Sequence, residues 1–372
     1  MNEQLNIGIA LDLGEGAPGL WQGDALLAAT FLGMVLSHSP RVARCVAFDG
    51  AAGTEPDMAM AGGQAPLPVI SRSEAIGQLD LVIEIGLRLP EAWATHFTAR
   101  GGVLVSQRLS SDLIADGESM IFNRPIGALP APNAYREIWV WPAHAASSGS
   151  YHHYTGLALV HVVPHLWSPA PLDHAAALMG ADWHYRPERK AWRLAVMEPN
   201  LSSVAACHLP LILCDEAFRR RPDAIAGVTI SHAQALVQSP HFNHFAHSLE
   251  LVRQGRAVFL DAAAPIAVLG ARADALVSHH WGSTHSYRHD EALHGGFPLI
   301  HNSAFLADCG YRYGDMDPEE GAQCLLAALR HHDDNLASYA VTARRFLAGL
   351  DPNAPRQVAA YEARLHALFP LA

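Results

Sequence analysis

The densest concentration of side chains able to do chemistry runs from Ser278 to Ser303. It reads SHHWGSTHSYRHDEALHGGFPLIHNS, with His, Ser and acidic residues between two short apolar runs. This pattern predicts a strand, a polar loop, a short helix and a second strand. Imidazole is a common metal ligand, but no H-E-x-x-H or comparable spacing occurs, so we expect no metal site here. The hydrogen-bonding capacity favours a polar ligand.

A second candidate follows the first apolar run of the chain. Asp12 and Glu15 stand in a glycine-rich loop that precedes a helix predicted at Ala25–Leu36. Glycines allow backbone to approach a ligand closely, and a helix start offers free N–H groups. The third glycine of a dinucleotide fingerprint is misplaced, which disfavours a nicotinamide cofactor. Each carboxylate is either a helix cap or a functional group that faces a crevice.

A third candidate is the segment Glu198-Pro199-Asn200-Leu201-Ser202, which follows an apolar run at Trp192–Met197. Asn and Ser are favoured helix caps, so the segment predicts a helix start directly after a strand. The same arrangement binds anions such as diphosphates. Glu198, Asn200 and Ser202 are therefore candidate ligand-binding residues, and both interpretations remain open.

Short apolar runs that alternate with amphipathic stretches must position these candidates. This alternation is typical of parallel strands connected by helices, and its apolar continuity predicts burial on both faces. The predicted strands are Asn6–Leu11, Ala43–Phe48, Leu81–Ile85, Val103–Ser106, Ile138–Trp141, one that ends at Val163, then Trp192–Met197, Ala226–Ile230, Val258–Leu260, Ala275–Ser278 and Pro298–Ile300.

The strands form two series, which a proline-rich stretch at 164–171 separates. The α/β pattern therefore predicts two Rossmann-like, doubly wound domains that face a central cleft, where such sheets bind ligands. We expect an N-terminal domain over 1–170, a C-terminal domain over 171–350, and a helix within 351–372 that packs back on the N-terminal domain. Apolar residues at helical spacing in Gln357–Phe369 indicate this last helix.

Composition narrows the classes of partner. The 372 residues carry a formal net charge of −11, which argues against nucleic acid as a partner. Five widely spaced cysteines form no C-x-x-C pair and suit a reducing compartment. No run approaches the roughly 20 apolar residues of a membrane span, and no signal peptide is recognisable. The sequence predicts a soluble, cytoplasmic protein of undetermined oligomeric state.

One stretch resembles the donor-site signature of GT-B glycosyltransferases. It is Glu291–Ile300, an acidic position on a short helix followed by a glycine turn and a Pro-led strand. The resemblance implies that Glu291 binds the ribose of a nucleotide-sugar donor, with Ser286, Tyr287 and Arg288 on the phosphate side. His301, Asn302 and Ser303 complete the implied donor site. No tightly bound cofactor is implied, because the nucleoside diphosphate sugar is a substrate.

Over nearly its full length the chain is similar to a glycosyltransferase-like bacterial family, the domain of unknown function 2827. The matching pieces are Leu20–Gly23, Asp80–Gly86, Ile138-Trp139, Pro164–Pro169, Glu198–Asn200, Gly295–Ser303, Gly310–Tyr313 and His331–Asp333. The run Ser286-Tyr287-Arg288-His289 departs from the Asn-Tyr-aromatic pattern that the resemblance leads us to expect. The family leaves the acceptor open, so a glycan, a protein or a small molecule all fit.

Transfer of a sugar requires that the departing diphosphate be stabilised and, for inversion, that a base deprotonate the acceptor. Backbone N–H groups and an arginine (Arg288, Arg256 or Arg272) can do the first without a metal. For the base, on the N-terminal domain, we expect Glu15, then Asp12, then His165. Inversion is favoured over retention. The alternatives are a sugar-nucleotide epimerase of the same architecture and an inactive nucleotide-sugar-binding protein.

Overall fold

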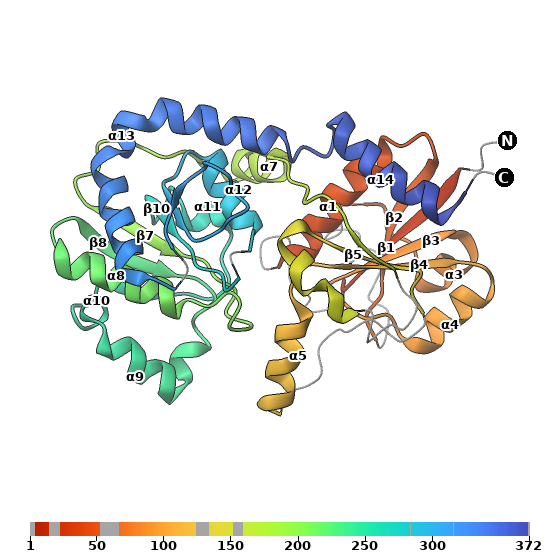
Figure 1. The fold of residues 1–372 in the computed structure, drawn as a ribbon, viewed down its shortest axis with the longest axis horizontal. Helices are drawn as coiled ribbons and strands as arrows, with labels where there is room; N and C mark the ends of the chain where they lie inside the picture. The colour runs from red at the N-terminus through yellow and green to blue at the C-terminus, as the bar shows by residue number, and fades with distance from the viewer. Residues whose placement is uncertain are drawn as a thin grey trace. The chain divides into compact units, whose positions relative to one another are not determined.

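The chain folds into two compact α/β units in a computed structural model. One unit is Met1–Trp167 together with Leu350–Ala372, and the other is Ser168–Gly349. The structure describes residues 4–14, 23–52, 67–123, 134–151, 159–282, 284–314 and 316–370. Each unit is built around its own six-stranded sheet. Figure 1 shows one sheet in each unit. Two Rossmann-like sheets are the fold that the alternating pattern predicts.

The first sheet has the order β2-β1-β3-β4-β5-β6, and every neighbouring pair is parallel. The strands are β1 (Leu5–Leu11), β2 (Val42–Asp49), β3 (Leu81–Ile85), β4 (Val103–Arg108), β5 (Glu137–Val140) and β6 (Leu159–Val162). The helical segments are α1 (Asp24–Ser37), α3 (Arg72–Gln78), α4 (Glu91–Ala99), α5 (Asp112–Ile121), the 3₁₀ helix η1 (Pro142–Ser150) and α14 (Pro355–Leu368).

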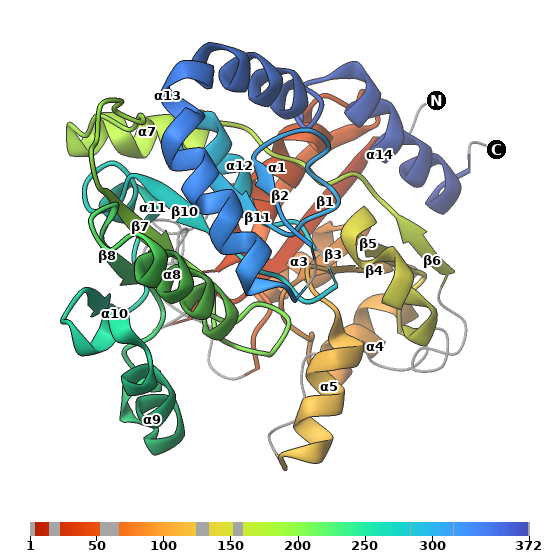
Figure 2. The ribbon, with the colours of Figure 1, turned by 60° about the vertical axis from the view of Figure 1, so that its left-hand side comes forward.

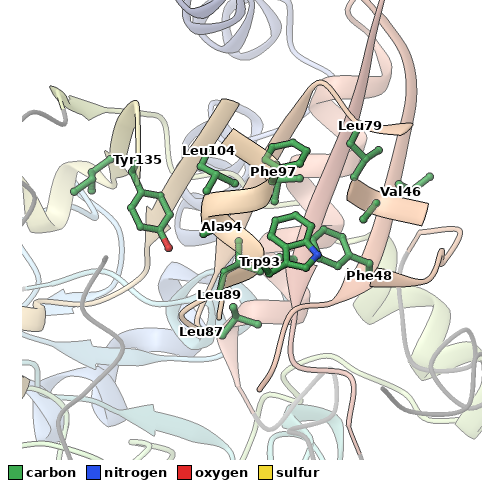
Figure 3. Close-up of a cluster of buried hydrophobic side chains, with 14 of the residues drawn as sticks. Val46, Phe48, Leu79, Leu87, Leu89, Trp93, Ala94, Phe97, Leu104 and Tyr135 are labelled. Atoms are coloured by element: carbon green, nitrogen blue, oxygen red, sulfur yellow. The ribbon is translucent and has the colours of Figure 1, made fainter. Parts of the chain in front are cut away.

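An aromatic core covers one face of this sheet. Trp93 and Phe97 of α4 stack on each other, and Trp93 also stacks on Phe48 of β2 (Figure 3). On the other face, Tyr361 of α14 meets Trp139 of β5 edge to face, and α14 also lies against α1. Side chains alternate along a strand, so Ile138 and Trp139 serve opposite faces. The terminal helix is therefore part of the first unit.

The second sheet has the order β12-β11-β10-β7-β8-β9 and is also parallel throughout. Its strands are β7 (Trp192–Val196), β8 (Ile225–Ile230), β9 (Ala257–Phe259), β10 (Ala275–Val277), β11 (Leu299–His301) and β12 (Tyr311–Arg312). The helical segments are α7 (Ala170–Met179), α8 (His208–Arg220), η2 (Leu236–Gln238), α9 (Pro240–Ser248), α10 (Glu250–Arg253), α11 (Pro265–Val268), α12 (Tyr287–His294) and α13 (Pro318–Ala348). Helices α8 and α13 lie side by side (Figure 2).

Local signals explain where the key helices begin and end. Asp317 caps α13 by accepting the N–H groups of Glu319 and Glu320, and Pro318 occupies the first turn, where no N–H partner is needed. Helix α12 ends at His294 with Gly295 as its C-cap. Gly296 follows with φ +70°, a conformation that glycine adopts without strain. The predicted glycine turn before β11 is confirmed.

The predicted strands agree with the observed ones to within two residues at each end where both ends were predicted. Strand β12 was not predicted, because two residues show no periodicity. Burial on both faces holds for β3 and β7 in the middle of the sheets, but β6 and β9 at the edges are partly exposed. Among the described residues, none of the helices is both long and apolar enough to cross a membrane.

Candidate active site

Glu198 joins the carboxyl ends of two neighbouring strands in the second unit. It follows β7 and is 3% exposed. Its Oε1 accepts hydrogen bonds from Ser278 Oγ at 2.7 Å and from the His279 N–H at 3.0 Å, and its Oε2 lies 2.9 Å from His280 Nε2. Ser278, His279 and His280 directly follow β10. The order of the sheet reverses between β7 and β10, which is where doubly wound sheets bind ligands.

The end of β11 is tied to the same place through His280. The His280 N–H donates to Asn302 Oδ1 at 3.0 Å, and Asn302 Nδ2 donates to the His280 carbonyl at 2.7 Å. The Nδ1 of His280 lies 2.6 Å from Thr284 Oγ1. All three side chains are buried. Reciprocal bonds of this kind hold the ends of β10 and β11 in one register.

The hydrogen bonds of Ser278 and Tyr313 determine which ring nitrogens carry protons. Ser278 Oγ donates to Glu198, so it accepts from His289 Nε2, 2.8 Å away. The Tyr313 hydroxyl donates to the Ser278 carbonyl, so it accepts from His279 Nδ1 at 3.0 Å. A neutral imidazole has one N–H, and the network therefore selects one tautomer for each ring. The histidines order the site as donors of defined direction.

Helix α12 brings the predicted phosphate and ribose residues together. Ser286 is its N-cap and makes no side-chain capping bond, and Tyr287 in its first turn is buried. Arg288 Nη1 lies 2.6 Å from Glu291 Oε2, and both side chains are largely buried. A helix start with an adjacent guanidinium favours an anion. The first turn of α12 also carries Asp290, so the positive charge at this end comes from the helix start and from Arg288 together.

Asn200 organises the loop between β7 and α8. Its Nδ2 donates to the carbonyls of Glu198 at 3.0 Å and His232 at 3.2 Å, and its Oδ1 accepts the N–H of Cys207 at 2.8 Å. The prediction of a helix start at this segment is wrong, because α8 begins only at His208. Asn200 instead holds a left-handed backbone conformation with φ +56°, which short amide side chains tolerate. Its amide is a brace between two strand ends.

Two of the remaining donor-site candidates stabilise the loop after β11, and one the loop after β7. His301 Nδ1 accepts the Ser303 N–H at 3.1 Å, so its Nε2 donates to the Cys309 carbonyl at 2.9 Å. Burial lowers the pKa of His301 to about 4, which keeps the ring neutral. Ser303 Oγ accepts the Phe305 N–H, and Ser202 Oγ accepts the Val204 N–H, each at 3.2 Å. Both hydroxyls order turns of these loops.

Two of the three arginines considered for the diphosphate lie at the wrong edge of the sheet. Arg256 immediately precedes β9, and Arg272 lies in the turn before β10. In a parallel sheet these positions belong to the amino edge, whereas Glu198, Ser278 and Asn302 follow strands at the carboxyl edge. The expectation for Arg256 and Arg272 is therefore corrected, and Arg288 remains.

The structure describes two of the three predicted bases. Asp12 follows β1, is exposed, and accepts the Gly14 N–H at 3.1 Å, so it shapes a turn. His165 is buried and meets Trp141 edge to face, with ring centroids 4.7 Å apart. Glu15 lies outside the described residues. Asp12 and His165 both belong to the first unit.

Sequence reasoning missed the part played by the residues after β10. Ser278, His279 and His280 stood in the segment recognised as rich in polar groups, but no role was predicted for them. His280 and Glu198 are 82 positions apart in the chain. The available signal was that both follow apolar strands. Only the placement of β10 beside β7 makes them partners.

The two parallel, Rossmann-like sheets give the chain the GT-B fold, which solved structures share. A variant of the O-GlcNAc transferase of Thermobaculum terrenum superposes with a TM-score of 0.58 and 13% identity over 99% of this chain and 68% of that one. A glycosyltransferase from Rickettsia africae gives 0.58 and 10%, covering 99% and 100%. HepE of Anabaena, solved in complex with UDP, gives 0.55 and 14%, covering 99% and 100%.

The particular family follows from the sequence. The chain belongs to the family described as protein of unknown function DUF2827, which matches residues 7–365. A search of curated proteins finds no match to this chain. At identities of 10–14%, the three solved structures establish the fold but not the reaction, which has to be argued from the residues of the site.

Proposed function

We propose that this protein is a glycosyltransferase whose second unit binds a nucleoside diphosphate sugar. One observation carries the proposal. The ends of β7, β10 and β11 are joined by Glu198, His280 and Asn302 at the reversal point of the second sheet. The N-terminus of α12, with Arg288 beside it, belongs to the same unit. The GT-B fold that the chain shares with solved glycosyltransferases supports the assignment.

In this proposal the diphosphate binds at the start of α12. The N–H groups of its first turn, Ser286 and Arg288 stabilise the negative charge that grows on the departing diphosphate, so the reaction needs no metal. Glu291 binds the ribose hydroxyls with a carboxylate that Arg288 already orients. Glu198, Asn200, Ser202, His301, Asn302 and Ser303 keep the surrounding loops in position.

The first unit supplies the base for the acceptor hydroxyl, which gives inversion at the sugar carbon. Glu15 is our first choice, Asp12 the second and His165 the third. A base must come within hydrogen-bond reach of the hydroxyl that it deprotonates. His165 ranks last because its imidazole is buried and packed on Trp141.

The donor assignment is tested by calorimetric titration of UDP, other nucleoside diphosphates and their sugars. UDP is the first probe because the related fold of HepE was solved with it. We expect Glu291→Gln to weaken nucleoside diphosphate binding by about 1.5–3 kcal/mol, because one charge-assisted hydrogen bond is lost. Glu319→Gln on α13 is the matched control, since that carboxylate is exposed.

Unchanged affinity in a folded Glu291→Gln protein would remove the ribose assignment. If no nucleotide in the panel binds the wild-type protein, the proposed function itself is wrong. Conversion of the donor to an epimerised sugar in the absence of an acceptor would identify an epimerase instead.

A further inference from the structure

Two buried polar atoms without partners lie just past the end of β8. Ser231 is 0% exposed, and its Oγ has no hydrogen-bond partner among the described residues. The Nδ1 of the next residue, His232, is also buried and has no partner there. Buried polar atoms are satisfied in the great majority of cases, and leaving one unpaired is costly. Two consecutive exceptions at the carboxyl edge of a parallel sheet are donors that a ligand at this edge could use.

The backbone at this position is strained as well. His232 has φ +55° and Asn200, at the end of the neighbouring strand β7, has φ +56°. Asn200 Nδ2 lies 3.4 Å from the Ser231 carbonyl and 3.2 Å from the His232 carbonyl, so one amide holds both residues. Left-handed conformations are uncommon outside glycine and cluster at functional sites. The brace keeps His232 in a conformation that the residue itself does not favour.

The charge at this position is set by α12 and β7. Burial, together with Arg288 of α12, lowers the pKa of His232 below its ordinary value of 6.5, and Glu198 after β7 opposes this shift. The imidazole is therefore neutral at pH 7. Arg288, which is paired with Glu291, adds positive charge near His232. Ser231 Oγ and His232 Nδ1 can both donate to an anion there.

We propose that Ser231 and His232, after β8, form a phosphoryl-binding subsite that works together with Arg288 of α12 in the second unit. This inference rests on the proposed function and adds two hydrogen-bond donors for the same diphosphate. Ser231 Oγ–H and His232 Nδ1–H donate to phosphoryl oxygens that Arg288 contacts from α12. Because a bound anion stabilises the imidazolium form, binding takes up a proton and strengthens as the pH falls from 8 to 6.

The experiment compares His232→Gly and Ser231→Ala with wild type, using inorganic pyrophosphate and UDP as probes in calorimetric titrations at pH 8, 7 and 6. Glycine adopts φ +55° without strain, so His232→Gly removes the imidazole and relieves the backbone together. We expect its Tm to equal or exceed that of wild type while pyrophosphate Kd rises about tenfold or more. Ser231→Ala should raise the pyrophosphate Kd about threefold or more and leave the Tm unchanged.

The control is His244→Asn, which replaces an exposed histidine of α9. It should leave both Kd values and their pH dependence unchanged. The pyrophosphate affinity of the wild-type protein, divided by that of the His232→Gly variant, should grow as the pH is lowered. Protonation of the probe itself cancels in this ratio.

The outcomes separate the two proposals. Pyrophosphate Kd values within twofold of wild type in both variants would overturn the subsite, as would a fall in Tm that accompanies every loss of binding. If UDP binds no more tightly than pyrophosphate, and His232→Gly still weakens both, the subsite stands and the nucleotide part of the proposed function fails.

Discussion

Each unit contains a buried glutamate that accepts hydrogen bonds from the neighbouring strand, yet the two differ in position. Glu84 on β3 accepts Ser106 Oγ at 2.7 Å, the Leu89 N–H at 3.0 Å and the Tyr135 hydroxyl. Arg108 Nη1 lies 3.8 Å from Glu84. Glu198 accepts a serine hydroxyl and a backbone N–H with similar lengths, but its third partner is a histidine.

The difference lies in the strands that each glutamate connects. The first sheet reverses between β1 and β3, and Glu84 links β3 to β4 on one side of that point. The second sheet reverses between β7 and β10, and Glu198 joins those two strands. The same hydrogen-bond pattern thus links two strands on one side of the reversal point in the first unit, and lies at the reversal point, where we propose the donor site, in the second. Position relative to the reversal point separates the two roles.

The largest expected effect concerns the first unit. Glu15→Gln should lower the rate of donor turnover about 10²–10⁴-fold, the usual loss when a general base is removed, and leave UDP affinity unchanged. The rate is measured as UDP released, with Glu91→Gln, an exposed carboxylate of α4, as control. A rate within a fewfold of wild type would move the base to Asp12, and a lowered Tm would show that Glu15 caps a helix.

The buried groups at β3 in the first unit and at β11 and α13 in the second should respond to pH in opposite directions. Burial lowers the pKa of His301 and of His332 from 6.5 to about 4. A base with a lowered folded-state pKa stabilises the fold above pH 6.5 and loses that contribution as the pH falls toward 4. Each of these two histidines contributes about 3 kcal/mol at most to the free energy of unfolding. Burial raises the pKa of Glu84 above 4.5, so its contribution is full below pH 4.5 and declines as the pH rises.

Hydrogen exchange at pH 7, 6 and 5 measures this difference peptide by peptide, after correction for the intrinsic exchange rate. Peptides from β11 and α13 should lose protection as the pH falls, and His332→Gln should flatten that dependence. Peptides from β3 and β4 should keep or gain protection. An equal loss in both units would show that the pH response does not arise from these side chains.

A matched pair of substitutions tests the comparison directly. Glu84→Gln and Glu198→Gln each replace one carboxylate oxygen by an NH2 group, which cannot accept a hydrogen bond from the donor at that position. Each should therefore cost about 1–3 kcal/mol of unfolding free energy. Only Glu198→Gln should also raise the UDP Kd, by about tenfold, since it loosens the ends of β7 and β10. Urea unfolding and calorimetry measure the two quantities. If the UDP Kd rises in both variants, or in neither, the hydrogen-bond networks of Glu84 and Glu198 do not differ in role.

The smallest expected effect is that of a chelator. The proposal assigns the stabilisation of the leaving group to α12 and Arg288, so excess EDTA should leave donor turnover within about twofold of its starting rate. Activity that disappears with EDTA and returns with Mg²⁺ or Mn²⁺ would contradict this assignment.

The sequence alone determined most of the strands and the two-sheet architecture. Hydrophobic periodicity and glycine turns depend on residues close in the chain, so the strands, α12 and the turn at Gly295–Gly296 were predictable. The tertiary structure decided which residues became partners. Arg256 and Arg272 lie at the amino edge of the second sheet, and Asn200 braces a loop where a helix start was predicted. Glu198 meets His280 only because β10 inserts beside β7. Strand order depends on contacts between residues far apart in the chain, which local patterns do not record.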